Sequence, residues 1–133
     1  MNHLFVPYEL AVKLKEKGFD EYCFAHYEVN NNVIIKRAIL KSSAQIYYNQ
    51  NNINPNNQYG DRFCTAPLYQ QAVDWLREKH NIHIEIVTGG HPKKYYVFVP
   101  KMVGGWIYDG NNQKEFDYYD GLVAGINEAL KLI

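Results

Sequence analysis

The sequence lacks the features that mark several large classes of protein. Neither sign of charge is in excess, because 14 Lys and Arg residues balance 14 Asp and Glu residues, so no overall field attracts nucleic acid or an anionic membrane. No apolar run approaches the roughly 18 residues that a membrane span requires. The first ten residues also lack the basic and apolar regions of a secretory signal. These absences predict a protein with no membrane segment and no strong affinity for nucleic acid.

Cysteine is scarce as well, since Cys23 and Cys64 are the only two in 133 residues. Two thiols in a chain of this length do not make a disulfide framework. Folding removes roughly 15,000 Å² of such a chain from water, which is enough for one core without disulfide or metal support. We therefore expect a single domain over residues 1–133, in a reducing cytoplasm.

Serine and glycine are too few, or wrongly placed, for two common kinds of active site. Ser42 and Ser43 are the only serines, and no G-x-S-x-G elbow is present. Neither glycine pair, at 89–90 or at 104–105, is followed by the basic residue and helix cap of a phosphate-binding loop. The carboxylates are scattered, with nothing that pairs them for acid–base work. The sequence predicts no catalytic residue, no metal and no cofactor.

Tyrosine is abundant, at 12 residues, and so is asparagine. This fits either the codon usage of an AT-rich genome or a surface built for recognition. Many of these residues fall in a polar stretch at 41–63 that has no helical or strand period. Loops of this length in a compact domain are either functional or mobile. Its tyrosines Tyr47, Tyr48 and Tyr59 are candidate contact residues.

Three segments have helical spacing of apolar residues. In the first, Pro7 suits the first turn and Gly18 the left-handed stop, with Phe19 folding back onto the helix. In the second, we expect Thr65 to be the N-cap, Pro67 to lie in the first turn and Asn81 to end the helix.

The third helix is predicted to start near Asp117, with Asp120 three positions on in a relation like a capping box. Its apolar stripe runs through Leu122, Ile126 and Ala129.

Strands are predicted in the remaining segments. Ile82, Ile84 and Ile86 alternate with polar residues, which is the period of a half-buried strand under the helix that precedes it. Further strands are expected at 21–27, 95–100 and 106–108. The segment 33–40 fits either a strand or a helix, and we favour a strand of the same antiparallel ribbon as 21–27. The order α-β-(β)-α-β-β-(β)-α with short turns indicates an α+β fold, a two-layer sandwich of an antiparallel sheet. We expect four or five strands, with three helices mainly on one face.

Four residues could form a ligand, thiol or metal site. Cys64 immediately precedes the second predicted helix, and a helix N-terminus lowers a thiol pKa. His83 and Glu85 leave the same face of a strand, and His91 lies in the adjacent turn, so nitrogen and oxygen ligands could hold zinc. Their spacing matches no known metal motif, and a solvated strand face explains the same residues. Cys23 is expected to be a small buried hydrophobe.

A basic and aromatic cluster raises single-stranded nucleic acid as another ligand. Lys93 and Lys94 precede Tyr95 and Tyr96, and Trp106 could add a stacking surface. The alternative is that these aromatic residues fill the core and that edge lysines prevent strand pairing.

Two segments together resemble a small uncharacterised protein family from gut-bacterial genomes, their tailed phages and related mobile elements. They are "VPYELAVKLKEKGFDEYCF" and "APLYQQAVDWLREKHNIHIEI", followed by an amphipathic C-terminal helix. The resemblance spans most of the chain except the Asn-rich stretch. It implies a phage or mobile-element origin, a bacterial host cytoplasm and a small domain of helices and strands. It implies no substrate and no catalytic residue.

The leading hypothesis is a non-catalytic binding or interaction module with an unidentified protein partner, which can also form a homodimer. Its expected contact residues are Tyr47, Tyr48, Tyr59 and Trp106, an aromatic residue typical of interface hot spots. The second hypothesis is a small-ligand binder or enzyme with a site near Cys64, His83, Glu85 and His91. The third is a single-stranded nucleic-acid binder.

Overall fold

The computed structural model describes residues 2–38 and 63–133, so the predicted contact residues Tyr47, Tyr48 and Tyr59 lie outside the described part. The chain divides into two compact units, Met1–Gln71 and Ala72–Ile133. The boundary falls inside helix α2 (Tyr69–His80). A single domain over 1–133 stays a prediction.

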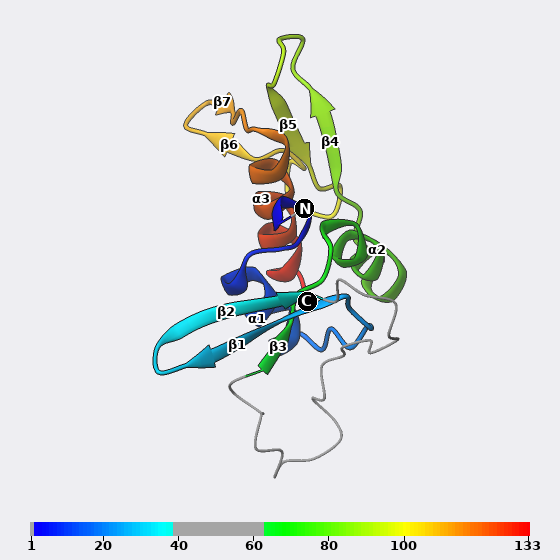
Figure 1. Cartoon of the computed structure of the whole chain (residues 1–133). Helices are drawn as coiled ribbons and strands as arrows, with labels where there is room; N and C mark the ends of the chain where they lie inside the picture. Colours follow the sequence, from blue (N-terminus) through cyan, green and yellow to red (C-terminus); the bar gives the residue numbers. More distant parts are fainter. Residues whose placement is uncertain (1, 39–62) are drawn as a thin grey trace. The chain divides into compact units, whose positions relative to one another are not determined.

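Unit 1 contains a short 3-10 helix η1 (Asn2–Leu4), helix α1 (Tyr8–Glu16) and three strands. The strands are β1 (Ala25–Asn30), β2 (Val33–Ala38) and β3 (Phe63–Thr65). They form one antiparallel sheet in the order β2-β1-β3, with β1 in the middle (Figure 1). The predicted strand at 33–40 is thus confirmed over its described residues, and the Asn31–Asn32 turn takes the positive φ values that asparagine tolerates.

Helix α1 begins and ends as its sequence predicts. Pro7 occupies the N-cap position, where the missing N–H of proline has little effect. At the other end Gly18 has φ +92°, a conformation that glycine adopts without steric strain. Phe19 N–H donates to Leu14 O at 2.9 Å and Gly18 N–H to Lys15 O at 3.0 Å, the bond pair of a Schellman motif. Phe19 is fully buried as a result.

Helix α2 starts later than predicted. Thr65 is not its N-cap, because Thr65 is the last residue of β3, paired with His26 of β1. Gln71 takes over the capping role: its Oε1 accepts the N–H of Leu68 at 3.0 Å, and its Nε2 donates to Tyr22 O at 2.8 Å. This is the N3 half of a capping box. Asn81, with φ +54°, follows the last helical residue as predicted.

Unit 2 contains the rest of α2, four short strands and helix α3 (Tyr118–Leu130). The strands pair as two antiparallel hairpins, β4 (Glu85–Thr88) with β5 (Tyr95–Phe98) and β6 (Tyr108–Asp109) with β7 (Asn112–Gln113) (Figure 1). Asp117 is the N-cap of α3 as predicted, although its side chain makes no capping hydrogen bond.

The α+β class with antiparallel pairing is confirmed, but the described strands do not form one sheet of four or five strands. They fall into sheets of three, two and two strands. In unit 2 the second edge of β5 is extended by isolated bridges, one from Phe98 to Trp106 and one from Tyr95 to Phe116. The predicted strand at 106–108 is therefore only partly formed, as a bridge at Trp106 followed by β6.

The alternation of the three isoleucines is confirmed. Ile82 is fully buried, Ile84 and Ile86 are half-buried, and the intervening His83 and Glu85 are exposed. Helix α3 packs on Ile84 and Ile86, where the sequence predicts the preceding helix α2. A Cβ built at Gly125 would lie 2.6 Å from Ile84 Cγ2, and one at Gly121 would lie 3.6 Å from Ile86 Cδ1. Glycine thus brings α3 close to the sheet.

Within residues 2–38 and 63–133, none of the helices combines the length and apolar character needed to cross a lipid bilayer.

Candidate functional site

The β4–β5 hairpin presents two faces of different character. Residues directly opposite each other in an antiparallel pair project from the same face. Ile86 lies opposite Val97, and both contact glycines of α3, so this is the inner face. Glu85 lies opposite Phe98 and Val87 opposite Tyr96, and these four residues project from the other side. Together with Trp106 they make up what we call the outer face.

Trp106 joins the outer face through the second edge of β5. It forms a bridge with Phe98, and the two ring centroids lie 4.8 Å apart with the rings inclined at 46°. The Phe98 ring crosses the backbone of Gly105, where a Cβ would lie 2.1 Å from Phe98 Cε2. Gly105 also has φ +75°, so glycine is required there by both space and conformation. The chain thus places two aromatic rings side by side.

The outer face is accessible to solvent. Val87 is 37% exposed, Glu85 is exposed, and Tyr96, Phe98 and Trp106 are half-buried. Aromatic and aliphatic side chains in this state lose further apolar area when another surface covers them. This is the geometry of a contact surface rather than of a core.

One end of the outer face is polar. Tyr96 Oη donates to Glu115 Oε1 at 3.3 Å, and Glu115 Oε2 lies 3.5 Å from Lys94 Nζ. Glu115 is thereby balanced by a cation. Within the described part of the chain, the side chain of Glu85, at the other end of the face, makes no ion pair or hydrogen bond.

The three residues of the predicted ligand site that belong to unit 2 do not form one cluster. His83 and Glu85 share the exposed side of the segment, as predicted. His91 lies in the turn beyond Thr88, so it is separated from His83 by about five strand residues, or roughly 16 Å. Cys64 belongs to unit 1. Among residues 2–38 and 63–133, no group of three or more His, Cys, Asp and Glu side chains is arranged to hold a metal ion.

The prediction that a helix N-terminus activates Cys64 is wrong. Cys64 lies inside strand β3 and is buried, and burial raises the pKa of its thiol to about 11. Burial likewise raises the pKa of Cys23 to about 12, although a hydrogen bond with Thr65 opposes the shift. A thiol is a nucleophile only as the thiolate. Cys23 is therefore the small buried hydrophobe that the sequence predicts.

His26 and Glu28 form a polar pair in unit 1. Its Nε2 lies 2.8 Å from Glu28 Oε1, two residues along the same face of β1. The imidazole is buried, whereas the carboxylate is about one-third exposed. The pair places a polar group inside the sheet.

The aromatic cluster proposed for nucleic acid is split between the two faces. Tyr95 contacts Tyr118 of α3, with ring centroids 5.5 Å apart, so it lies on the inner side. Tyr96 projects from the outer face with Trp106. Lys94 is paired with Glu115. The sequence neighbours Tyr95 and Tyr96 therefore do not provide one stacking surface.

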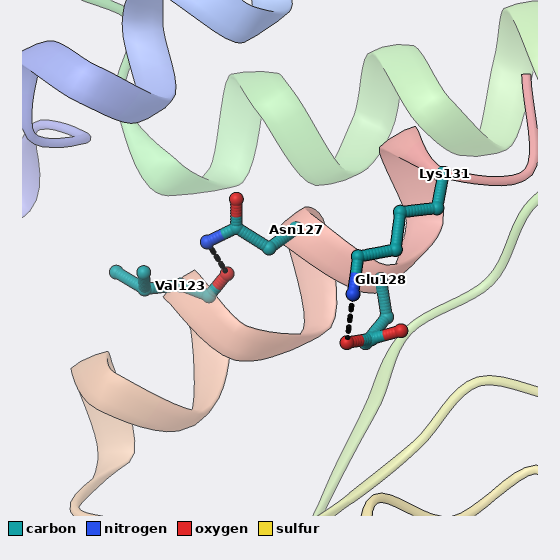
Figure 2. A network of polar contacts seen from close by, with 4 residues as sticks. All are labelled: Val123, Asn127, Glu128 and Lys131. Atoms are coloured by element: carbon teal, nitrogen blue, oxygen red, sulfur yellow. Dashed lines mark hydrogen bonds and ion pairs between the residues drawn. The ribbon is translucent and has the colours of Figure 1, made fainter.

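A groove along α3 was not predicted from the sequence. It has a volume of about 600 Å³, and its charged lining residues are Lys94, Lys114, Glu115, Asp117 and Asp120. The three carboxylates offset the two lysines, and Lys114 Nζ lies 5.2 Å from the centroid of the Phe116 ring. Toward the C-terminal end of α3, Asn127 Nδ2 donates to Val123 O and Lys131 Nζ pairs with Glu128 Oε1 (Figure 2). These bonds join neighbouring turns of the same helix.

The sequence identified Trp106 as a contact residue and named Tyr96 and Glu85 for other roles, but it did not identify Phe98 or Val87. In "YYVFV" every residue is apolar or aromatic, so period-2 alternation does not separate an inner from an outer side. The face of each residue is decided by the pairing of β5 with β4 and with Trp106. A signal that could have found Phe98 is the glycine pair before Trp106, which permits a ring to lie across the backbone.

Comparisons of the chain with models of protein families, with curated proteins and with solved structures gave no match.

Proposed function

We propose that the chain is a non-catalytic protein-interaction module whose contact surface is the outer face of the β4–β5 sheet. The observation that carries this proposal is the gathering of Tyr96, Phe98 and Trp106 on the side of the sheet that does not pack on α3. Trp and Tyr are the residues most enriched at interface hot spots, because they bury a large area with little loss of conformational freedom.

The charges of the face favour a partner that presents an arginine among apolar side chains. Glu85 is exposed and lies directly across from Phe98, whose ring neighbours Trp106. A guanidinium can pair with a carboxylate and stack on an aromatic ring at the same time. At the other end Glu115 is already balanced by Lys94. Glu85 is thus the acidic group offered to a partner.

As part of the same proposal, the module acts in the cytoplasm of a bacterium that carries a phage or a related mobile element. The sequence resemblance supports this origin, and the two buried free thiols suit a reducing compartment.

Selection from a random peptide library displayed on phage tests the proposal. We expect wild-type protein to enrich peptides that combine Arg with aromatic or aliphatic residues. Their affinity, measured by fluorescence polarisation, should fall by at least about tenfold in Trp106→Ala, as for the loss of one hot spot. Glu85→Gln should reduce the preference for Arg while retaining the apolar preference.

Phe24→Ala is the matched control, because Phe24 is also an exposed aromatic residue, at 54%, but belongs to unit 1. It should leave peptide affinity unchanged. Peptides that bind wild type and Trp106→Ala equally well, or that lose affinity only in Phe24→Ala, would refute the outer face as the contact surface.

A further inference from the structure

On the edge of strand β4 that faces away from β5, backbone N–H and C=O groups form no hydrogen bonds with other described residues. In an antiparallel pair, residues that bond the neighbouring strand alternate with residues whose N–H and C=O groups point away. Gly89 donates to Lys94 O at 2.8 Å, so every second residue counted back from Gly89 bonds to β5. The backbone groups of Ile84, Ile86 and Thr88 therefore point away from β5.

Strand β5 has no such open edge, because its side away from β4 is already hydrogen-bonded. Tyr95 and Phe116 exchange two backbone hydrogen bonds, of 3.0 and 2.9 Å, and Ile107 N–H donates to Val97 O at 3.2 Å. Strand β4 is thus the outer strand of its sheet (Figure 1). Within residues 2–38 and 63–133, no strand pairs with its second edge.

This edge has no lysine, no proline and no bulge, which are three of the devices that prevent strands from adding to a sheet. It is short, at four residues, and Glu85 is its one charged residue. The strand reads Glu-Ile-Val-Thr and pairs with β5 in continuous register, without a bulge. The two residues before it, His83 and Ile84, continue the alternation of exposed and half-buried side chains.

We propose that two copies of the chain pair antiparallel through β4, about a two-fold axis at Ile86. In this register Ile86 bonds to the partner's Ile86, and Ile84 bonds to the partner's Thr88 on each side of the axis. Since each bonding pair exchanges two bonds, the interface contains about six backbone hydrogen bonds. A two-fold axis closes the assembly at a dimer.

For a second copy of the chain, the charge pattern of β4 favours this register. Glu85 is the only charged residue of the strand. With the axis at Ile86, Glu85 lies opposite the partner's Val87, so no like charges meet. An axis shifted to Glu85 would instead place the two carboxylates directly opposite each other, which is destabilising.

A pair of charge substitutions at Val87 tests the dimer and its register together. Val87 is 37% exposed, so either charge is tolerated by the fold. Val87→Glu sets a carboxylate against the partner's Glu85 twice per dimer and should weaken dimerisation by roughly threefold to tenfold. Val87→Lys creates two attractive pairs and should strengthen it by a similar factor. Sedimentation equilibrium at low salt from about 10 μM to 1 mM measures both.

Cross-linking gives a second readout of the register. Glu85 and the partner's Val87 form a non-bonded pair, with Cα atoms about 4.5 Å apart, within reach of a disulfide. Glu85→Cys combined with Val87→Cys should therefore give a covalent dimer with copper–phenanthroline as oxidant. Either single variant should not, and the buried Cys23 and Cys64 provide the wild-type background.

The dimer does not rest on the proposed function, because β4 pairs by its edge and the partner protein binds the outer face. Trp106→Ala should lose peptide binding and keep the dimer. The dimer would be overturned if wild type and Val87→Lys both remain monomeric at 1 mM. It would also be overturned if Glu and Lys at Val87 have equal effects on dimerisation. An extended peptide of another sequence that adds to β4 of a monomeric chain would overturn it as well.

Discussion

The two units fill the space beside their sheets in different ways. In unit 1 the middle strand β1 is paired on both sides, and its surroundings include the buried thiols Cys23 and Cys64 and the buried polar residues His26 and Thr65. In unit 2, aliphatic side chains of the inner face meet α3 at its glycines, which set how closely the helix approaches. The first interior contains groups that titrate or form hydrogen bonds, whereas the second depends on steric fit. Unit 1 should therefore respond to pH and unit 2 to added volume.

Unit 2 also has a distinctive outward surface. Unit 2 presents an aromatic outer face, built from residues that the inner face does not need, and an edge of β4 with which no described strand pairs. Because α3 already covers the inner face, the outer side chains contribute little to the described core and are available for recognition. This division of a sheet into one structural and one recognising face is common where one side is solvated.

The largest expected effect concerns the core of unit 1. Phe19 is fully buried at the end of α1, and its truncation to alanine should lower the free energy of unfolding by about 3–5 kcal/mol. Both tryptophans, Trp75 and Trp106, belong to unit 2. Tryptophan fluorescence thus follows unit 2, whereas far-ultraviolet circular dichroism follows both units. If residues 1–133 form one domain, both signals should shift together in urea.

Phe24→Ala is the matched control, since it removes the same side chain from an exposed position of the same unit. It should change stability by no more than about 0.5 kcal/mol. A Phe19→Ala variant whose circular dichroism shifts while its fluorescence transition stays in place would show that the units unfold independently. The comparison of the two units would then become one of two domains.

Local features of the fold could be predicted from the sequence, and non-local features could not. The ends of α1 and the alternation at Ile82, Ile84 and Ile86 depend on neighbouring residues and are confirmed. The cap predicted at Thr65 was wrong because β1 pairs with Thr65, nearly 40 positions away in the sequence. The same pairing buries Cys64 and removes its predicted reactivity.

The candidate site was predictable only in part, for a related reason. Trp106 can be identified by its residue type and its place after two glycines. The other members of the outer face are fixed by the register of β4 with β5, since a shift of one residue would exchange the two faces. His83 and Glu85 are exposed as the period predicts, and it is the pairing of Glu85 with Phe98 that gives the carboxylate an aromatic neighbour.

Alkaline pH should destabilise unit 1 through its buried acids. Burial raises the pKa of Cys23 from 9.0 to about 12, of Cys64 from 9.0 to about 11 and of Tyr27 from 10.0 to about 12. Above pH 9 the unfolded chain therefore releases thiol protons that the folded chain retains. The stability is complete below pH 9 and falls as pH rises, with a slope of up to about 2.7 kcal/mol per pH unit from the two thiols.

Urea unfolding at several values between pH 8 and 11 measures this slope. Cys64→Ala removes one of the two thiols, so the thiol contribution to the fall of unfolding free energy with pH should be about half as steep. Each protein is compared with its own stability at pH 8, because the variant is less stable at every pH. Phe24→Ala, which changes no titrating group, should keep the wild-type slope. An equal alkaline slope in wild type and Cys64→Ala would contradict a titrating interior in unit 1.

The smallest expected effect sharpens the steric half of the comparison. Gly125 and Gly121 lie in the same helix, and alanine at either position gains about 1 kcal/mol of helix propensity. At Gly125 the new Cβ would lie 2.6 Å from Ile84 Cγ2 and 3.1 Å from Val97 Cγ1, whereas at Gly121 its nearest neighbour is Val97 Cγ2 at 3.2 Å. Ile84 and Val97 are β-branched, with stiff side chains that cannot easily turn aside.

Overpacking of this kind costs about 1–3 kcal/mol, so Gly125→Ala should be net destabilising and Gly121→Ala nearly neutral. The difference between the two variants cancels the gain in propensity and isolates the contact between α3 and the sheet. We expect it to be about 1–2 kcal/mol in urea unfolding at pH 7. Equal stabilities would mean that α3 can move away from β4 and β5 freely, and that the inner face of unit 2 is not limited by steric fit.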